Sequence, residues 1–304
     1  MRRNWAIYLL LVPAFLMMAL FTYFPAIQAL YESFFNWWPG AYNDFVGFQN
    51  YERLFRWEAF WWSWGNWVKF AVFHFTAPFV MPFVMAECIF NLRRRSTQAF
   101  WRMAVIVPSL IPGIVTFVLW RWMYQVDGGF NIILEMIGLG HFVAPWLGQP
   151  STALYAMMFV GFPWAIGASV LIVLAGLENI SGDIMDAAII DGCGRFRRIF
   201  AIDLPNITGV IRLFLVFGII GIFQEFSRFL AMTGGGPYFS TTVPALHMFF
   251  KAGFKGVRSE SATGSTSHGE AAAIATILFI LILVFSLLTH RYIRGSTEAE
   301  GTKN

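Results

Sequence analysis

Six apolar runs, each long enough to cross a lipid bilayer as a helix, dominate this sequence. They cover residues 5–30, 66–90, 103–124, 152–177, 207–232 and 271–289. A spanning helix needs about 20 apolar residues, because the hydrocarbon core is about 30 Å thick and each residue rises about 1.5 Å. Every backbone polar group must be paired internally in hydrocarbon, so such runs fold as helices. The sequence therefore predicts an all-α integral membrane protein with six transmembrane helices.

The composition leaves no room for a large soluble domain. Of the 304 residues, 58% are hydrophobic and only 12% are charged, against about a quarter charged in a soluble domain. A net charge of +4 is too small to suggest a nucleic-acid partner. We expect the whole chain, 1–304, to form a single transmembrane domain surrounded by the lipid bilayer.

Basic residues predict which loops face the cytoplasm. Arg2 and Arg3 precede the first run, a cluster of arginines lies within 93–102 after the second, and Arg291 and Arg294 follow the last. Lysine and arginine in short loops favour the cytoplasmic side. We therefore expect both termini in the cytoplasm. The first run is too long for a cleaved signal segment and lacks a small-residue cleavage site, so it is expected to be retained.

A polar island interrupts the apolar pattern between the fourth and fifth runs. Residues 186–205 read DAAIIDGCGRFRRIFAIDLP, and their charges would each cost several kcal/mol in hydrocarbon, so the island must lie outside it. Its apolar residues are spaced for one face of a short helix on either side of Gly192. Asp186 and Asp191 are expected to cap helix starts or to pair with a partner's cations. The pattern predicts a protein-docking surface; a helix lying on lipid headgroups is the alternative.

The fifth run differs from the others because it carries several polar and ionisable residues: Arg212, Gln224, Glu225 and Arg228. Such residues inside a membrane mark a substrate path or a buried ion pair. Gly218 and Gly221 lie one and two turns earlier and would thin the helix where a substrate approaches. Two interpretations remain open, substrate contact and a structural ion pair between Glu225 and Arg228 on one helix face.

Tryptophans cluster around the start of the second run, at Trp57, Trp61, Trp62, Trp64 and Trp67. Tryptophan is enriched at the membrane–water interface, and an interfacial belt is the main expectation. Stacking on a sugar ring is the minority alternative.

Other classes of site have little support in the sequence. Cys88 and Cys193 lie in different environments, so we expect neither a structural disulfide nor a metal site. The five histidines are scattered without metal-ligand spacing or a nucleophile–base set, which disfavours a membrane-embedded enzyme. The chain has no GxxxxGK[ST] motif, so it is not expected to hydrolyse ATP.

The island and two further stretches resemble the permease subunits of bacterial ATP-binding-cassette (ABC) importers, in the carbohydrate-uptake family that includes maltose and glycerol-phosphate permeases. FVGFQNYERLF (45–55) and AMTGGGPYFSTTVPALHMFFKAGF (231–254) are similar to family motifs, and the GGP stretch is typical of the type related to the maltose system's larger permease. The island resembles the family loop EAA-x2-DGA, with Asp186 for the usual Glu and Cys193 for the usual Ala. Its matching residues are Asp191, Gly192, Phe200, Leu204 and Pro205.

The resemblance covers nearly the whole chain and implies a type I ABC importer permease fold in a bacterial cytoplasmic membrane. Implied partners are a second related permease, two ATPase subunits, an extracytoplasmic solute-binding protein and a carbohydrate substrate. ATP and Mg²⁺ would be bound by the ATPase subunits, with no cofactor in this chain. Residues 178–205 would form a cytoplasmic coupling loop whose ATPase-docking residues are Asp186, Ala187, Ala188, Ile190, Asp191, Gly192, Cys193 and Pro205.

The family's sugar path runs along the fifth span and part of the fourth. Carried over to this sequence, and combined with the polar residues above, it indicates a set of path residues. These are Trp164, Ala168, Gly218, Gly221, Gln224, Glu225, Phe226 and Arg228.

An ion-coupled secondary carrier of a small polar solute is the alternative function. Such carriers are typically built from internal repeats and carry broken helices at the bilayer midplane. The sequence shows no internal repeat, and a carrier of this kind has no use for a docking island.

Overall fold

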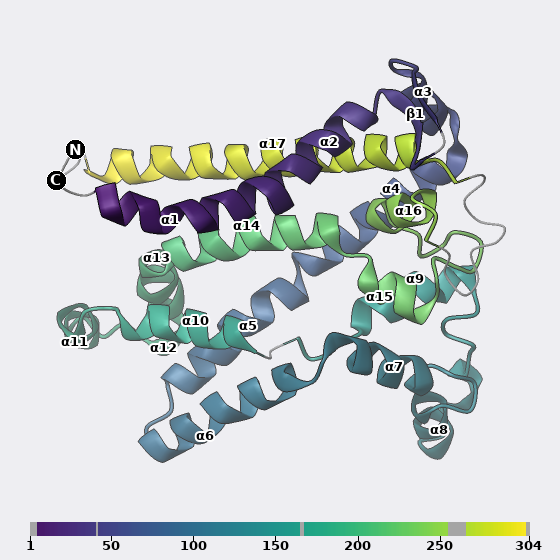
Figure 1. Ribbon diagram of the computed structural model, residues 1–304. Coiled ribbons are helices and arrows are strands. Elements are labelled where there is room, and N and C mark those ends of the chain that lie inside the picture. Colours follow the sequence, from purple (N-terminus) through teal and green to yellow (C-terminus); the bar gives the residue numbers. More distant parts are fainter. Residues whose placement is uncertain (1–4, 41, 165–166, 255–265, 302–304) are drawn as a thin grey trace.

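The computed structural model describes residues 5–40, 42–164, 167–254 and 266–301, so most of the polar segment 254–269 lies outside the described residues (Figure 1). The described part is helical apart from one short hairpin. In chain order the elements are α1 (Trp5–Met18), η2 (Ala19–Tyr23), α2 (Phe24–Glu32), β1 (Phe35–Trp38), β2 (Tyr42–Phe45), α3 (Gln49–Arg56), α4 (Glu58–His74), α5 (Ala77–Phe90), α6 (Arg95–Ile106), η3 (Val107–Leu110), α7 (Gly113–Met123), α8 (Gly129–Met136), η4 (Gly140–Phe142), α9 (Pro150–Phe159), α10 (Ala168–Glu178), α11 (Gly182–Ile190), α12 (Arg195–Arg198), η5 (Ile199–Asp203), α13 (Leu204–Asn206), α14 (Thr208–Gln224), α15 (Ser227–Met232), α16 (Pro244–Lys251) and α17 (His268–Gly301).

Three continuous helical segments in the described residues are long and apolar enough to cross a membrane. They are Tyr8–Glu32, Glu58–Phe90 and His268–Thr289, and they correspond to the first, second and sixth predicted spans. Three bent pairs raise the number of candidate spans to as many as six, with the paired helices meeting at 71° to 84°. These pairs are Arg95–Leu110 with Gly113–Met123, Ala168–Glu178 with Gly182–Ile190, and Arg195–Asn206 with Thr208–Gln224.

The predicted fourth span, 152–177, is not a single helix. α9 ends at Phe159 and α10 begins at Ala168, and the described residues between them form turns. Pro163 lacks an N–H group to continue a helix, and Gly167 has φ of 83°, a left-handed conformation that ends regular helix. The apolar run thus covers two short helices, because hydropathy counts residues and does not register where the backbone turns.

Two π-helical turns precede prolines at matching positions. η2 lies just before Pro25, and η5 just before Pro205. A proline ring clashes with the carbonyl group four residues earlier and offers it no hydrogen bond, and a wider turn relieves both problems. The second of these turns lies in the segment that follows the polar island.

The island lies at one end of the molecule, and the hairpin lies at the other. Figure 1 shows α11 and α12 at the same end as the start of α1 and the end of α17, with β1 and α3 at the opposite end. The hairpin pairs its strands antiparallel, with Phe35 opposite Phe45 and Trp38 opposite Tyr42. The start of α1 and the end of α17 therefore lie with the island, at the end that the positive-inside rule predicts to be cytoplasmic.

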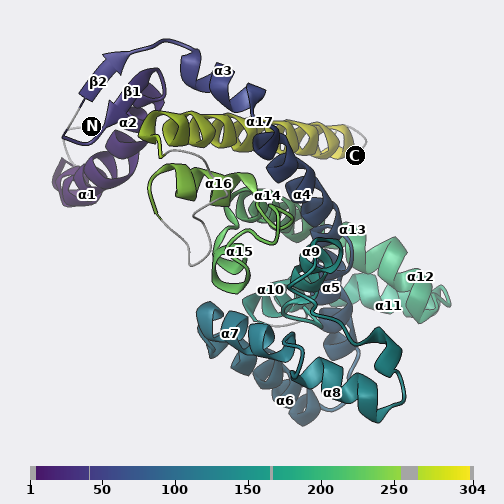
Figure 2. The same cartoon turned by 90° about the vertical axis from the view of Figure 1, so that its right-hand side faces the viewer.

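Three clusters of buried apolar side chains hold the helices together. One joins α5, α6 and α10 with the start of α14; a second joins α4, α9, α15 and α16; a third joins α3, α4, α14, α16 and α17. The lipid tails around a membrane protein are as apolar as leucine, so close packing rather than escape from water favours such clusters within the bilayer. In Figures 1 and 2, α14 runs beside α17, one of the helices that it packs against in the third cluster.

A buried charged and aromatic cluster anchors α16 near the hairpin end. His247 is 1% exposed, and its ring lies against those of Trp57 (4.7 Å) and Phe60 (6.2 Å), while neither ring nitrogen has a hydrogen-bond partner among the residues that the structure describes. One turn later, Lys251 Nζ lies 2.7 Å from Glu270 Oε2 and 4.4 Å from the centroid of the Trp57 ring. Burial, and then the Lys251 charge, lower the pKa of His247 to about 3.

We expect this histidine to make folding stability depend on pH. The folded protein keeps His247 neutral, whereas the unfolded chain binds a proton below pH about 6.5. Stability should therefore fall as pH drops from about 6.5 toward 3, by at most about 1.4 kcal/mol per pH unit. Thermal unfolding of the purified protein across this range measures the effect.

His247→Phe keeps an aromatic ring in place and removes the titrating group, so it serves as the comparison. The difference in unfolding midpoint between the variant and the parent protein should grow as pH falls. The carboxylates are common to both proteins, so the effect of their titration on stability cancels in this difference. Parallel pH profiles for the two proteins would contradict the assignment.

Candidate docking loop and substrate path

The turn of the polar island follows from one glycine at the end of α11. Gly192 has φ of 65°, a conformation that favours glycine because a Cβ atom would be strained there. Its N–H donates to the carbonyl of Ile189 (3.1 Å), and the N–H of Cys193 donates to the carbonyl of Ala188 (2.9 Å). These two hydrogen bonds together form the Schellman motif, which ends many helices. The helix–turn–helix form expected from the sequence is therefore present.

The aspartates of the island do not cap helix starts, contrary to one sequence expectation. Ser181 caps α11, its hydroxyl accepting the N–H of Asp183 at 3.3 Å, while Gly194 precedes α12. Asp186 lies inside α11 with an exposed side chain, and Asp191 follows its last residue. The carboxylates consequently remain accessible to a partner's cations.

The apolar side chains of α11 split between the core and the exterior. Ala188 is 5% exposed, so it packs inward and is not available to a partner, which corrects the expectation that it belongs to the docking face. Ile189 and Ile190 are 74% and 85% exposed. The other predicted docking residues are exposed, or partly exposed in the case of Cys193; they are Asp186, Ala187, Asp191, Gly192 and Pro205. The tip of the loop thus presents isoleucines flanked by carboxylates.

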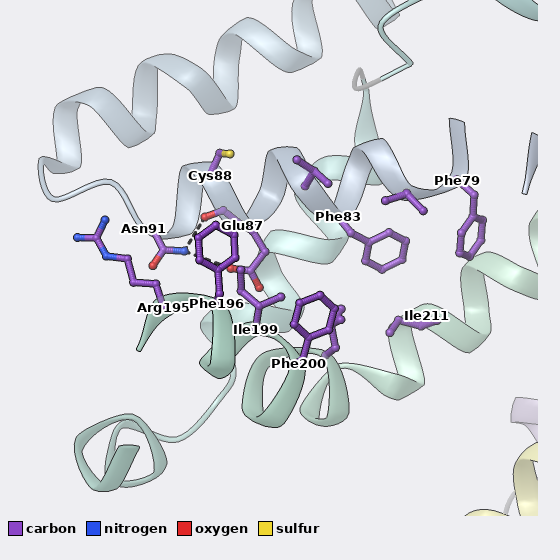
Figure 3. Close-up of a pocket in the computed structure, with 13 residues that line it drawn as sticks. Phe79, Phe83, Glu87, Cys88, Asn91, Arg195, Phe196, Ile199, Phe200 and Ile211 are labelled. Carbon is purple, nitrogen blue, oxygen red and sulfur yellow. Dashed lines mark hydrogen bonds between the residues drawn. The ribbon is translucent and has the colours of Figure 1, made fainter. Parts of the chain in front are cut away.

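The segment after the turn, residues 195–206, forms an arm that lies beside α5 and encloses an apolar groove. The groove has a volume of about 730 Å³. Figure 3 shows Phe196, Ile199 and Phe200 of the arm directed toward α5, which contributes Phe79 and Phe83. The apolar residues of the arm therefore line this groove instead of extending the face of α11, because the turn at Gly192 redirects the chain.

A buried polar network ties the arm to the end of α5. Arg198 Nε lies 3.0 Å from Asp203 Oδ2, and Asp203 is fully buried. Arg198 Nη2 donates to Asn91 Oδ1 (2.6 Å), and Asn91 Nδ2 donates to the backbone oxygen (2.8 Å) and Oε2 (3.1 Å) of Glu87. The sequence pattern does not show that these residues are partners. The one signal was a charged residue, Asp203, inside an otherwise apolar stretch.

The fifth predicted span breaks at Glu225. α14 ends at Gln224, Glu225 has an extended backbone (φ −71°, ψ 111°), and α15 begins at Ser227. The ion pair expected from the sequence required Glu225 and Arg228 to lie on one helix face. Because the helix breaks between them, they do not. Instead Glu225 Oε1 accepts the backbone N–H of Arg228 at 3.2 Å. The carboxylate supplies a partner for an N–H group that the break leaves without one.

Arg228 reaches across three other helices. Its Nη1 donates to the carbonyl of Met157 on α9 (3.2 Å). Its guanidinium lies 5.3 Å from the ring centroid of Phe70 on α4 and 5.9 Å from that of Phe117 on α7. A cation held over aromatic faces is stabilised by their negative charge density, by about 2 kcal/mol or more when water is excluded. The side chain therefore joins α15 to three other helices.

The two glycines of α14 that the sequence assigned to the substrate path, Gly218 and Gly221, serve different purposes. A Cβ atom on Gly218 would lie 3.2 Å from Phe75 Cε1 and 3.8 Å from His74 Nε2, so this glycine permits close packing against the junction of α4 and α5. A Cβ atom on Gly221 would meet nothing within 4 Å. Gly221 and Gln224 are both exposed, which leaves this side of α14 open to a solute. His74 was not identified from the sequence, where an isolated histidine in an apolar run has no distinguishing pattern.

The remaining path residues, Trp164, Ala168 and Phe226, have different surroundings. The Trp164 ring lies 5.4 Å from that of Phe73, and its indole Nε1 is buried without a hydrogen-bond partner in the described residues. Ala168 is exposed at the start of α10. Phe226 stacks on Phe249 of α16 at 5.2 Å, so it packs away from this region. The structure brings together Trp164, Gly218 and Arg228 around the end of α4 and leaves Phe226 in the packing of α16.

Within the described residues, no group of three or more His, Cys, Asp or Glu side chains is arranged to hold a metal ion. Cys88 and Cys193 are both free thiols.

A multi-span helical protein with an exposed, rigidly turned loop at one end has the form of a membrane component that works with a partner protein. A family model described as the binding-protein-dependent transport system inner membrane component matches residues 79–296. The chain belongs to this family of transport permeases, and the permease resemblance inferred from the sequence is confirmed.

Similar proteins cover nearly the whole chain. It is 28% identical over 293 residues to a probable ABC transporter permease protein, YurN, of Bacillus subtilis, covering 96% of this chain and 97% of that protein. It is 27% identical to the multiple sugar-binding transport system permease protein MsmF of Streptococcus mutans, covering 95% and 94%. A chain of a bacterial ABC transporter that imports the acidic polysaccharide alginate has the same fold, with a TM-score of 0.81, 21% identity and 96% coverage of each chain.

We predict that Arg198→Met loosens the arm. It leaves the Asp203 carboxylate buried without its cation, which costs about 3 kcal/mol locally. Amide hydrogen exchange of residues 195–206 should speed up by about 100-fold, since each 1.4 kcal/mol is a factor of ten.

Arg197→Met is the matched control, because Arg197 is exposed on the same helical turn. Adding Asp203→Leu to Arg198→Met should restore much of the protection, since a buried pair can often be replaced by apolar residues. Equal exchange in both single variants would show that the pair does not hold the arm.

Proposed function

We propose that this chain is the transmembrane permease subunit of an ATP-driven importer for an oligosaccharide or related carbohydrate. The observation that supports this proposal most directly is the rigid, exposed turn at Gly192. It presents Ile189 and Ile190 on a loop that is hydrogen-bonded to a membrane helix. Support for a carbohydrate comes from relatives: MsmF of Streptococcus mutans, and the trehalose/maltose permease MalF of Thermococcus litoralis at 28% identity.

In this proposal the loop couples the permease to ATPase subunits, which bind ATP and Mg²⁺ while this chain contributes no catalytic residue. Ile189 and Ile190 enter an apolar cleft of an ATPase subunit, and the exposed carboxylates of Asp186 and Asp191 pair with cations at its rim. A push on the tip then passes along the arm to α5 through Arg198 and to α14 through the 71° bend at its start.

A second, related permease completes the translocation path in the same proposal. The first candidate span, Tyr8–Glu32, has none of its apolar window buried in this chain. In a bilayer, van der Waals packing against another helix stabilises such a helix more than contact with lipid alone. A solute-binding protein delivers the substrate at the hairpin end, and both termini of this chain lie in the cytoplasm with the loop.

The substrate path in this proposal follows the open side of α14 to its break. Gly221 and Gln224 offer backbone and amide groups to sugar hydroxyls, Glu225 offers a carboxylate, and Trp164 offers part of an aromatic ring. An ion-coupled carrier also uses broken helices of this kind. The match to a binding-protein-dependent family argues against that alternative.

We predict that Gly192→Val uncouples transport from ATP hydrolysis. A valine at φ of 65° is strained by at least about 1–2 kcal/mol, so the turn should reorganise and displace the tip. Uptake by reconstituted complexes should fall at least tenfold, and stimulation of ATP hydrolysis by the loaded binding protein should be lost.

Gly194→Val is a close control for this substitution. Gly194 has φ of −65° and ψ of 157°, which valine adopts without strain, and a Cβ atom there meets nothing within 4 Å. Uptake and stimulated hydrolysis should stay near the parental level in this variant. If Gly192→Val behaves like Gly194→Val, the coupling role of the turn is wrong.

We predict that the charge of Glu225 matters for transport separately from its structural contact. Glu225→Gln keeps an oxygen that can accept the Arg228 N–H, whereas Glu225→Ala removes it. If the carboxylate contacts substrate, both variants should assemble and should reduce uptake about tenfold or more, with a raised KM for the substrate-loaded binding protein. Parental kinetics in Glu225→Gln, with a loss confined to Glu225→Ala, would leave Glu225 a structural residue only.

A further inference from the structure

A small pocket lies near the start of α4, at the end of the molecule opposite to α11 (Figure 1). Its volume is about 250 Å³. One wall is a stripe of α4 that includes Trp61, Trp62 and Lys69, and the other is the loop between α15 and α16, which includes Tyr238 and Phe239. The residues assigned above to the docking loop and substrate path lie elsewhere.

The loop wall of this pocket is held in a strained conformation. Tyr238 and Phe239 have φ of 46° and 59°, a region that costs a non-glycine residue about 1–2 kcal/mol. Asn66 of α4 secures the loop, its side-chain amide donating to the carbonyls of Phe239 (2.8 Å) and Thr242 (3.0 Å). The result is a Tyr238 side chain that is 86% exposed beside the pocket. Strain that the surrounding structure maintains is typical of ligand-binding segments.

The chemistry of the pocket combines aromatic surface with polar groups. Trp62 is about half exposed and lies 5.8 Å from the Phe239 ring, so part of its indole face is uncovered. Lys69 supplies an exposed ammonium group. Ser240 supplies a buried hydroxyl with no hydrogen-bond partner in the described residues. A saccharide unit has apolar C–H faces and a ring of hydroxyls, and a carboxylated, sulfated or phosphorylated unit adds an anion for Lys69.

The pocket is aligned with the predicted substrate path. Trp62, Asn66, Lys69 and Phe73 follow one another at spacings of three and four residues, so they share one face of α4. At about 1.5 Å per residue, the distance from Trp62 to Phe73 along the helix is about 16 Å. The Phe73 ring contacts that of Trp164. A solute leaving the pocket along this face therefore arrives at the path.

We propose that this pocket is an outer receiving subsite for one acidic unit of the transported saccharide. The proposal rests on the function proposed above. It adds the position at which the saccharide first contacts this chain and a preference for a negatively charged sugar unit. The pocket's size favours a single sugar unit over a protein partner, since specific protein interfaces bury about 800 Å² on each side. The indole N–H of Trp61 donates to the carbonyl of Phe55 at 2.9 Å, so it is not directed to lipid headgroups as in an interfacial belt.

The test uses the complete transporter in lipid nanodiscs without its binding protein. The probes are a hexuronic acid trisaccharide and a neutral hexose trisaccharide, each carrying a photoreactive diazirine. After irradiation, mass spectrometry should locate the acidic probe on peptides that contain Trp62 or Tyr238. Trp62→Ala should reduce labelling by both probes about tenfold. Lys69→Gln should reduce labelling by the acidic probe alone, and because Lys69 is exposed this variant should fold normally.

Trp122→Ala is the matched control, since Trp122 is equally exposed but lies on α7, and it should leave labelling unchanged. Labelling that Trp62→Ala and Lys69→Gln do not alter would overturn the proposal. So would a loss of binding-protein capture in these variants with labelling intact, which would indicate a protein-docking surface.

Uptake by the parent protein separates this subsite from the proposed function. If the parent complex imports saccharides while the variants keep parental labelling and KM, the subsite alone fails. If it neither imports nor is labelled by either saccharide, the proposed function fails as well.

Discussion

The ion pair between Arg198 and Asp203 is the interaction on which the arrangement of the docking loop depends. Asp203 is fully buried, so its carboxylate can be tolerated only with a cation close by, and Arg198 supplies one at 3.0 Å. The same guanidinium reaches Asn91 at the end of α5. If Arg198 and Asp203 contacted only each other, the ion pair would stabilise the arm without connecting it to another helix. Because this one also reaches α5, the arm and that helix are expected to move together, and the isoleucines at the tip sit on a support that resists bending.

A second constraint is the need to satisfy backbone groups wherever a membrane helix breaks. The break between α14 and α15 leaves N–H groups without intrahelical partners, and Glu225 accepts one of them from Arg228. Arg228 in turn donates to the carbonyl of Met157 at the end of α9, where a second helix stops. Glu225 and Arg228, which look like an isolated ion pair in the sequence, thus supply hydrogen-bond partners for backbone groups at two separate helix ends. Their charges remain beside the predicted path because the helices are interrupted there, where irregular backbone is tolerated.

The sequence was sufficient for the fold class and for the turn at Gly192, since both depend on local properties: run length, and a glycine after a helical stretch. It was insufficient where the outcome depended on the rotation of a short helix. Ala188 packs inward although Ile189 and Ile190 are exposed, and a sequence of nine helical residues does not determine which side faces the core. Gly161, Pro163 and Gly167 visibly interrupt the run 152–177 in the sequence, but hydropathy alone does not show that the run divides into two separate helices. Gly218 was read as room for substrate, whereas the ring that occupies that room, Phe75, comes from a distant segment.

The segment formed by α4 and α5 connects these observations, because it extends from the pocket beside Trp62 to the network at Asn91. Its two helices meet at Phe75 and Thr76, and this junction packs against Gly218 of α14. A shift of the arm would act on one end of this segment through Asn91, while the far end holds the loop of Tyr238 through Asn66. The turn at Phe75 and Thr76, where the N–H of Thr76 donates to the carbonyl of Phe73 (3.0 Å) instead of continuing the α-helical pattern, is where the two ends can change their relative angle at the least cost in helical hydrogen bonds. Since Phe75 and Phe73 at that junction contact Gly218 and Trp164, a change of angle there alters the width of the predicted substrate path directly.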